Sequence, residues 1–401
     1  MTAPGDPLPS FEFATATRIV FGPGRLQELG PLARDLGRRA LIVTGSHPER
    51  AQPLRDLLSE AGVSSETFPI HREPTTLDIA TGLARAKLTG CNLVVGFGGG
   101  SAIDAAKAVA GLLTNDRDLF DSLEVVGRGQ PLTRPAAPWI AIPTTAGAGA
   151  EVTRNAVLTS REHKVKASLR SPLLLARVAL VDPRLTLDLP PAVTLTTGLD
   201  ALTQLIEPFV GLRANPLVDA LCLDGIRRIR QALATAVTDG RNLAARTEMA
   251  LAALYGGIAL ANAGLGVVHG LAAPIGGSHP APHGAVCAAL LAPSFAGNVR
   301  ALRARAPDSP ALARYAIVAR ELTTDPGATP ETGAAWLADW LRTLGAPSLS
   351  SLGIPNTAFA DLAEKGLAAS SMKSNPVPLT RDELIALLEA ASGTPASNPR
   401  A

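Results

Sequence analysis

The pattern of hydrophobic residues changes character about halfway along the chain. Before residue 185, short apolar runs at 39–45, 92–96, 139–142 and 178–181 alternate with helical stretches at 53–61 and 103–113. Short apolar runs separated by helical stretches are typical of buried parallel strands with helices on both faces of the sheet. This half of the chain therefore predicts an α/β domain.

The strand-like runs end after the Leu-Pro-Pro sequence at 189–191. The rest of the chain is rich in Ala and Leu at helical spacing, for example at 217–235, 243–263 and 381–391. The length allows two domains, each with its own core. We predict an α/β domain with a parallel sheet over residues 1–187 and an all-helical domain over residues 188–401.

Composition narrows the class of partner. The chain has 401 residues, of which 18% are charged, and a formal net charge of +2. This balance argues against a nucleic acid or a membrane surface as partner. Three scattered cysteines fit a reducing compartment. The N-terminus lacks signal-peptide character and no apolar run reaches the ~18 residues that span a bilayer, so a cytoplasmic protein is expected.

A glycine-rich segment directly follows the predicted strand at 92–96. Gly98, Gly99, Gly100 and Ser101 lead into a helical stretch that also carries Asp104. Glycines let the backbone approach a pyrophosphate, and the following helix offers free N–H groups and a positive dipole end. The spacing differs from the G-x-G-x-x-G fingerprint, so a glycine-rich turn without a ligand stays an alternative.

A second loop of small residues follows the predicted strand at 139–142. It contains Thr144 and Thr145, whose hydroxyls suit contacts to a phosphate or a ribose. A polar strand-to-helix connection is the alternative for this loop alone. Because ligands of parallel sheets bind beyond the carboxyl ends of the strands, two such loops after consecutive strands predict one nucleotide site.

Candidate metal ligands lie in the helical half. His269, His279 and His283 stand in a run rich in Gly and Pro, so bulky neighbours do not block their imidazoles. Upstream, Asp200 and Gln204 are four residues apart, which places both side chains on one face of a helix. One Asp and two His suit a catalytic divalent metal with one position left open for substrate.

Four segments in this order resemble the iron-containing (group III) alcohol dehydrogenase family: GGGSAIDAAK at 98–107, PTTAGAGAEVT at 143–153, TGLDALTQLIEPF at 197–209 and GLGVVHG…PHG at 264–284. The resemblance covers nearly the whole chain, from 18–22 to the Asn-Pro pair at 375–376. It implies a dinucleotide-binding domain, a helical domain and a metal in the cleft between them. It also implies interconversion of alcohols with aldehydes or ketones by a nicotinamide cofactor. A homodimer or larger homo-oligomer is implied too, with the segment 11–20 offering a strand for the interface.

The resemblance assigns metal ligation residue by residue. The family's Asp falls on Asp200, and its two later histidines fall on His269 and His283. The ligand four residues after the Asp is usually His, and here it is Gln204, whose carbonyl oxygen is a poorer ligand. We expect the metal to be retained, with Gln204 as a further ligand left open. Both Fe²⁺ and Zn²⁺ stay open, because Asp plus two His suits either ion.

Proton transfer is unresolved in the sequence. The resemblance implies a histidine four residues beyond His269, where this chain has Ala273. We predict that His279 is a catalytic residue beside the three metal ligands. The alternatives are that solvent or a ribose hydroxyl transfers the proton, and that His279 is only an exposed loop residue. Cys287, among Ala and Val, is interpreted as a core residue rather than a nucleophile.

Cofactor choice depends on the end of the strand at 39–44. The family's NAD-selective members tend to carry an acidic residue just after this strand, where this chain has Thr44 and then Gly45, followed by His47 and Arg50. Loss of the carboxylate removes repulsion against a 2′-phosphate, which slightly favours NADP(H) and leaves dual use open. Lys166 matches a family lysine near the cofactor, and a solvated charge at a strand edge is the alternative.

Three alternatives remain beside a metal-dependent NAD(P)H oxidoreductase of a small alcohol and its aldehyde or ketone. A dehydroquinate-synthase-like lyase needs several basic residues, but most of the arginines between 200 and 283 have a helix-surface pattern. A maleylacetate-reductase-type enzyme usually has a His-rich segment, replaced here by VVHGLAA at 267–273. A nucleotide-binding protein with a decayed metal site would explain Gln204 and Ala273, although the retained Asp and His ligands argue against it.

Overall fold

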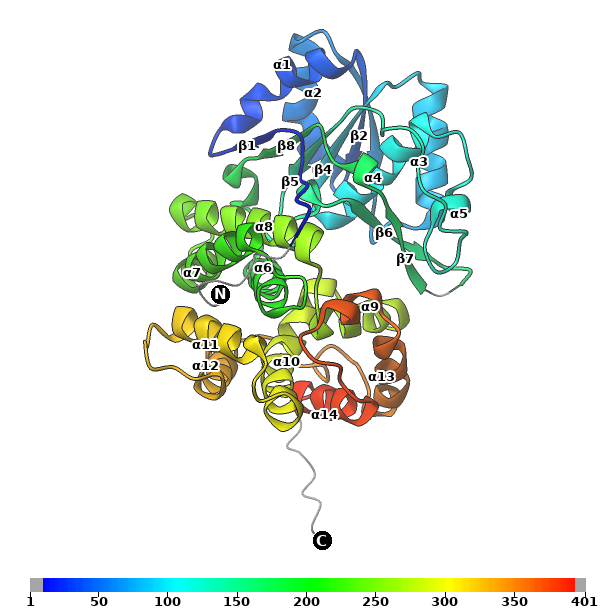
Figure 1. The fold of residues 1–401 in the computed structure, drawn as a ribbon. Helices are drawn as coiled ribbons and strands as arrows, with labels where there is room; N and C mark the ends of the chain where they lie inside the picture. Colours follow the sequence, from blue (N-terminus) through cyan, green and yellow to red (C-terminus); the bar gives the residue numbers. More distant parts are fainter. Residues whose placement is uncertain (1–9, 164, 394–401) are drawn as a thin grey trace. The chain divides into compact units, whose positions relative to one another are not determined.

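The computed structural model describes residues 10–163 and 165–393, and its chain divides into two compact units (Figure 1). The first unit comprises Ala14–Leu189 together with Gly240–Ala250. Within the described residues, the second comprises 10–13, Pro190–Asp239 and 251–393. A parallel sheet in the first unit and helices in the second confirm the predicted fold class.

Six parallel strands form the sheet of the first unit, in the order β1-β8-β5-β4-β2-β3. Their bounds are β1 (Ile19–Phe21), β2 (Arg39–Thr44), β3 (Ser64–Pro69), β4 (Leu93–Gly98), β5 (Trp139–Pro143) and β8 (Val178–Val181). The chain runs outward from β2 to β3, then returns to β4 on the other side of β2 and continues to β5. The strand order therefore reverses between β2 and β4, the position at which sheets of this kind bind ligands.

Helices cover both faces of this sheet, as the strand–helix alternation predicts. They are α1 (Leu29–Leu36), α2 (Gln52–Glu60), α3 (Thr76–Leu88) and α4 (Gly100–Thr114). Leu32 of α1 and Leu54 of α2 pack with Ile42 of β2 in one buried cluster. On the opposite face α4 lies so close to β4 that a Cβ at Gly96 would be 2.8 Å from the Cβ of Ala106.

An antiparallel hairpin outside the main sheet was not predicted. It consists of β6 (Asn155–Ser160) and β7 (Val165–Arg170). The fully buried Lys107 of α4 holds the beginning of this hairpin in place. Its Nζ donates to Thr153 Oγ1 and to the Asn155 carbonyl, both at 2.7 Å. Burial in low dielectric lowers the pKa of Lys107. The sequence analysis also did not identify β1, β3 or α3.

The second unit is built from helices around a second core. Its longer helices are α6 (Pro191–Val210), α7 (Pro216–Thr238), α9 (Val267–Ser278), α10 (His283–Arg305), α11 (Pro310–Thr323), α12 (Pro330–Thr343), α13 (Phe359–Leu367) and α14 (Arg381–Ala391). The helix α8 (Leu243–Ala263) is shared, since its residues up to Ala250 belong to the first unit. A glycine permits close packing of α6 and α7: a Cβ at Gly225 would be 2.7 Å from Leu205 Cδ1.

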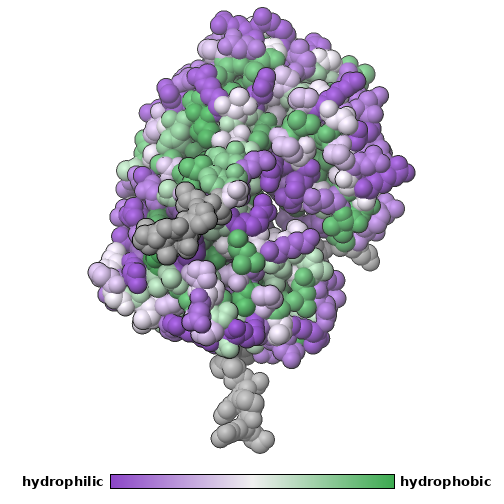
Figure 2. Space-filling view, viewed as in Figure 1, coloured by the Kyte–Doolittle hydropathy of each residue, from purple (hydrophilic) through white to green (hydrophobic). Residues whose placement is uncertain are grey.

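Two helices, α8 and α10, are long and apolar enough to cross a membrane by length and composition alone. The expectation that no apolar stretch is that long therefore does not hold. Within the most apolar window of each helix, 61% and 78% of residues are buried in the protein, and core helices pass the same test. Hydrophilic residues spread over the face seen in Figure 2, with smaller hydrophobic areas between them.

Candidate active site

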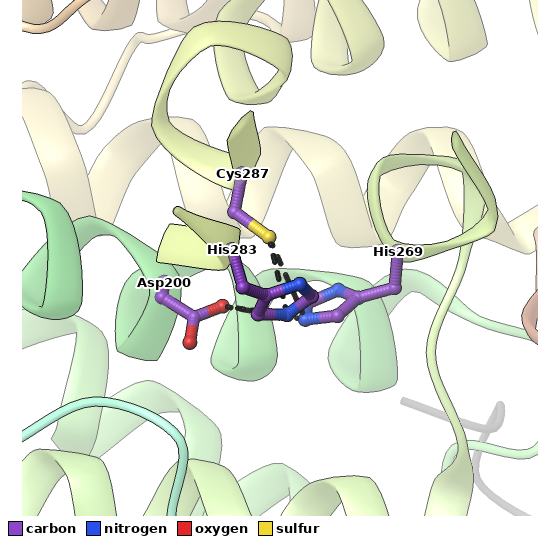
Figure 3. Close-up of side chains that lie close together, drawn as sticks. All are labelled: Asp200, His269, His283 and Cys287. Atoms are coloured by element: carbon purple, nitrogen blue, oxygen red, sulfur yellow. Dashed lines mark hydrogen bonds and ion pairs between the residues drawn. The ribbon is translucent and has the colours of Figure 1, made fainter. Parts of the chain in front are cut away.

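Three helices of the second unit bring four potential metal ligands together (Figure 3). Asp200 comes from α6, His269 from α9, and His283 and Cys287 from α10; one donor atom of each lies within 4.8 Å of all the others. His269 Nε2 is 3.3 Å and His283 Nε2 is 3.9 Å from the same Asp200 oxygen, Oδ1. The first three residues are those that the sequence proposes as ligands.

The first turn of α9 is held by side chains from distant segments. Gly266 precedes the helix and offers no side chain to cap it. Instead, Asn375 Oδ1 accepts from the Val267 N–H at 3.1 Å, and Glu207 Oε1 accepts from the Val268 N–H at 2.7 Å. These bonds satisfy N–H groups that a helix start otherwise leaves unpaired. They also fix the position of His269, the next residue of α9.

Glu207 orients the imidazole of His269 as well. Its Oε2 lies 2.7 Å from His269 Nδ1, and both side chains are buried. With Nδ1–H donated to the carboxylate, Nε2 is left as the atom that faces Asp200. A histidine ligand that donates its other nitrogen to a carboxylate is the usual arrangement at protein metal sites. The sequence analysis did not assign this role, although Glu207 stands two helical turns after Asp200 on α6.

Gln204 lies one turn after Asp200, on the same face of α6 as predicted from the spacing. Its Nε2 donates to Asp200 Oδ2 at 3.1 Å. Its Oε1 is buried without a hydrogen-bond partner and faces α8, where a Cβ at Gly256 would be 3.6 Å from it. The amide thus supports the carboxylate that the sequence proposes as a ligand.

The charges of the cluster favour an ionised Asp200. Burial raises the pKa of this carboxyl, but the contact with His269 at 3.3 Å and the charges of His283 and His269 outweigh the effect of burial, and the pKa falls to about 2. Burial of Cys287 and the Asp200 charge together raise the pKa of the thiol to about 12 in the metal-free protein.

The residues present fit a divalent cation. Asp200 Oδ1 is buried and accepts no hydrogen bond, although it is the carboxylate oxygen closest to the two imidazoles. An anionic oxygen and two imidazole nitrogens form a ligand set for Zn²⁺ or Fe²⁺. The side chain of His283 is 39% exposed, so one side of the cluster is accessible.

His279 lies just beyond α9, four residues before His283, and is half-buried. Its Nδ1 is buried without a hydrogen-bond partner. Ala273, where the resemblance implies a histidine, lies on α9 and is exposed. Of the three histidines between 264 and 284, His279 is the one that lies outside the ligand cluster.

In the first unit the loops after β2 and β4 touch each other. Gly98 has φ of +154°, and a Cβ there would lie 2.7 Å from Ala102 Cβ and 3.3 Å from the Gly45 nitrogen. A Cβ on Gly99 would be in contact with Thr145 at 3.5 Å, and the Thr144 N–H donates to the Gly98 carbonyl at 2.9 Å. The three loops at the reversal of strand order therefore form one continuous backbone surface.

This surface suits a dinucleotide. No side chain caps the start of α4, and its first turn carries no acidic residue. The helix begins at Gly100 and Ser101 with Gly99 as its N-cap, so backbone N–H groups are available to a phosphate. A Cβ on Gly45 would meet nothing within 4 Å, which shows open space beside the end of β2.

Two other predicted cofactor residues have partners within the first unit. Asp104 accepts from the Val157 N–H at 3.0 Å and lies 3.4 Å from Lys107 Nζ. Lys166 of β7 forms an ion pair with Glu73 at 2.6 Å, and its side chain is 9% exposed. Thr44 is buried, with its hydroxyl unpaired.

Comparison with known proteins identifies the family. Residues 16–183 match the iron-containing alcohol dehydrogenase family, and residues 194–392 match its C-terminal region. Alcohol dehydrogenase 4 of Saccharomyces cerevisiae is 35% identical over 382 residues, which cover 92% of this chain and 96% of that protein. The structure of a 1,3-propanediol oxidoreductase gives a TM-score of 0.88 at 32% identity, covering 96% of this chain and 100% of that chain. Sulfoacetaldehyde reductase from Bifidobacterium kashiwanohense, solved in complex with NAD⁺, gives 0.84 at 27% identity with coverage of 96% and 100%.

These matches support an alcohol oxidoreductase and give no support to the lyase, maleylacetate-reductase or decayed-site alternatives. Members of the matched family use NAD(P) and a divalent metal, in agreement with the loop surface of the first unit and the ligand cluster of the second. The chain therefore belongs to the iron-containing alcohol dehydrogenase family and is a metal-dependent oxidoreductase of alcohols and their carbonyl counterparts.

Proposed function

We propose that this enzyme interconverts a small alcohol and its aldehyde or ketone, with Asp200, His269 and His283 holding the divalent cation. The observation that carries the proposal is the convergence of these three donors within 4.8 Å of one another, from three different helices. When bound, the cation would polarise the oxygen of the substrate; NAD(P)H supplies the hydride in carbonyl reduction, and NAD(P)⁺ accepts it in alcohol oxidation.

The chain's own residues prepare this chemistry. Asp200 provides a buried negative charge, and Gln204 and Glu207 hold Asp200 and His269 in place through hydrogen bonds. Such outer contacts fix the orientation of the ligands before substrate arrives. We assign proton exchange at the substrate oxygen to His279, supported by its unpaired Nδ1 and by the lack of acid–base capacity in Ala273.

For the cofactor we propose both NADP(H) and NAD(H), with a slight preference for NADP(H). Gly45 leaves room at the end of β2 and puts no carboxylate there. His47, however, is paired with Glu49 at 3.1 Å. This carboxylate in the same loop would repel a 2′-phosphate, so we propose that the preference for NADP(H) is small. We assign binding of the cofactor phosphates to the loops of Gly98–Ser101 and Thr144–Thr145. We also assign Lys166 to the cofactor site.

We further propose a cytoplasmic homodimer or larger homo-oligomer. The three cysteines, Cys91, Cys222 and Cys287, are all free and buried, which fits a reducing compartment. The edge strand β1 begins within the segment 11–20, which is the part of the chain that the sequence proposes for the interface.

The experiment is an initial-rate assay of NADH and NADPH oxidation against a panel of aldehydes, ketones and oxo-acids. Enzyme stripped with a chelator and enzyme reloaded anaerobically with Fe²⁺ or Zn²⁺ are compared. We expect turnover in the reloaded samples and its loss in the stripped sample. Cofactor binding without turnover of any carbonyl, at full metal occupancy, would contradict the proposal.

A further inference from the structure

Cys287 lies one helical turn after His283, on the same face of α10, and its sulfur points into the ligand cluster (Figure 3). Sγ is 3.6 Å from His283 Nε2 and 3.9 Å from His269 Nε2. The side chain is fully buried. A core cysteine would place its sulfur among apolar side chains, whereas this sulfur lies against the Nε2 atoms of the two imidazoles, which also face Asp200.

The side chain of Gln204 does not point into the ligand cluster. Its nitrogen donates to Asp200 Oδ2, the oxygen that does not face the imidazoles, and its own oxygen faces Gly256 of α8. Sulfur, by contrast, is among the four donors within 4.8 Å of one another. The fourth donor of the cluster is therefore a sulfur on α10 rather than an amide oxygen on α6.

On the basis of the proposed function, we propose that Cys287 is the fourth protein ligand of the metal, as a thiolate, and that Gln204 is a positioning residue for Asp200. Binding forms the sulfur–metal bond as the S–H bond breaks, and the proton passes to solvent. A thiolate is a soft ligand that zinc accepts readily beside imidazole and carboxylate, so the set of Asp200, His269, His283 and Cys287 favours Zn²⁺ over Fe²⁺.

Cobalt provides a readout that does not depend on turnover. Co²⁺ replaces zinc in such sites, and a thiolate bound to Co²⁺ gives a near-ultraviolet charge-transfer band that oxygen and nitrogen ligands do not give. The full-length protein is stripped with a chelator and titrated anaerobically with Co²⁺, and the absorption spectrum is recorded. We expect the band at one equivalent of Co²⁺ in the wild-type protein.

Three variants assign the band. Cys287→Ser should lose it and bind the metal more than about 100-fold more weakly, beyond the range typical of outer contacts. Gln204→Leu should keep the band and lose only about 10- to 100-fold in affinity, as expected of a residue that acts through Asp200. Cys222→Ala, which removes another fully buried thiol on α7, should leave both band and affinity unchanged.

The wild-type spectrum tests whether Cys287 is a thiolate ligand even if a variant fails to fold. Stoichiometric Co²⁺ binding without the band would overturn the thiolate ligand and leave the proposed function intact. Failure to bind any divalent ion would overturn the metal centre itself, and with it the proposed function. Competition of equimolar Fe²⁺ and Zn²⁺ for the stripped protein should give a higher bound zinc-to-iron ratio in wild type than in Cys287→Ser; equal ratios would refute the assignment of metal preference.

Discussion

Glu207 and His269 are joined by a buried contact of 2.7 Å between the carboxylate Oε2 and the ring Nδ1. The same helix, α6, carries Asp200, so one element supplies a proposed metal ligand and the group that orients a second proposed ligand. Because the second oxygen of Glu207 accepts the Val268 N–H, the carboxylate fixes both the ring and the backbone that carries it.

Glu207→Gln should weaken metal binding about 10- to 100-fold, because a neutral amide is a poorer acceptor for the Nδ1–H of the ring. The value of kcat/KM at limiting metal should fall in parallel and recover when metal is in excess. Metal titration by calorimetry or by cobalt absorbance gives the affinity. Glu331→Gln, which removes an exposed carboxylate paired with Arg303, is the matched control and should bind metal normally. An unchanged affinity in Glu207→Gln would show that this contact does not support the ligand.

His269→Ala should abolish metal binding and activity while nucleotide binding persists, because the loops proposed to bind phosphate belong to the first unit and His269 to the second. Metal content by mass spectrometry and NADPH affinity by fluorescence test the two halves of the prediction. His163→Ala, at the turn between β6 and β7, is the control. A fully active His269→Ala enzyme would refute the metal assignment.

Gly45→Asp should lower kcat/KM with NADPH by about tenfold or more and leave the value with NADH nearly unchanged. The added carboxylate would repel the 2′-phosphate, and like charges near a protein surface interact by a few kcal/mol, about 4 at 4 Å. Sterically the change is mild, since a Cβ on Gly45 meets nothing within 4 Å. Gly45→Asn has the same size without the charge and should keep the wild-type ratio. The same loss in both variants would attribute the effect to bulk instead.

Glu151→Gln should change how stability depends on pH. Burial raises the pKa of Glu151 from 4.5 to about 7, although its backbone hydrogen bond and the charge of Lys107 oppose the shift. Between these values the unfolded chain has lost the proton that the folded protein retains. The contribution is therefore fully present below pH 4.5 and is lost as the pH rises through about 7.

The amide introduced by this substitution does not titrate, so the variant should gain stability relative to wild type as the pH rises from about 5 to about 8. A shift of this size corresponds to roughly 3 kcal/mol at most. Denaturation midpoints of both proteins at several pH values provide the measurement. Glu60→Gln, at the exposed end of α2, should show no such gain. A constant difference between Glu151→Gln and wild type across this range would contradict the raised pKa.

The central strands of the sheet could be predicted because burial on both faces makes them nearly continuous apolar runs, as in β2 and β4. The strand β3 could not, since it is an outer strand with the sequence Ser-Ser-Glu-Thr-Phe-Pro and half-exposed side chains. In β7, Lys166 and Ser168 alternate with buried residues, and only the pairing with β6 identifies it as a strand.

Asp200, His269 and His283 could be proposed as ligands from residue type and spacing, and the structure brings these three side chains together. Glu207 and Cys287 could not, because their roles depend on which helix faces meet. Glu207 reaches His269 across 62 residues of sequence. The four-residue spacing of His283 and Cys287 is visible in the sequence, yet it becomes informative only once α10 is known to turn this face toward α6 and α9.

Asn375 contacts the first turn of α9 across 108 residues of sequence, and Asn298 donates to the same oxygen. Glu207 reaches the Val268 N–H from earlier in the chain, but the Val267 N–H gains its partner only once the segment around residue 375 is present. We therefore expect a ribosome-stalled or C-terminally shortened chain to fold the proposed nucleotide-binding unit and to take up metal less readily than the full chain.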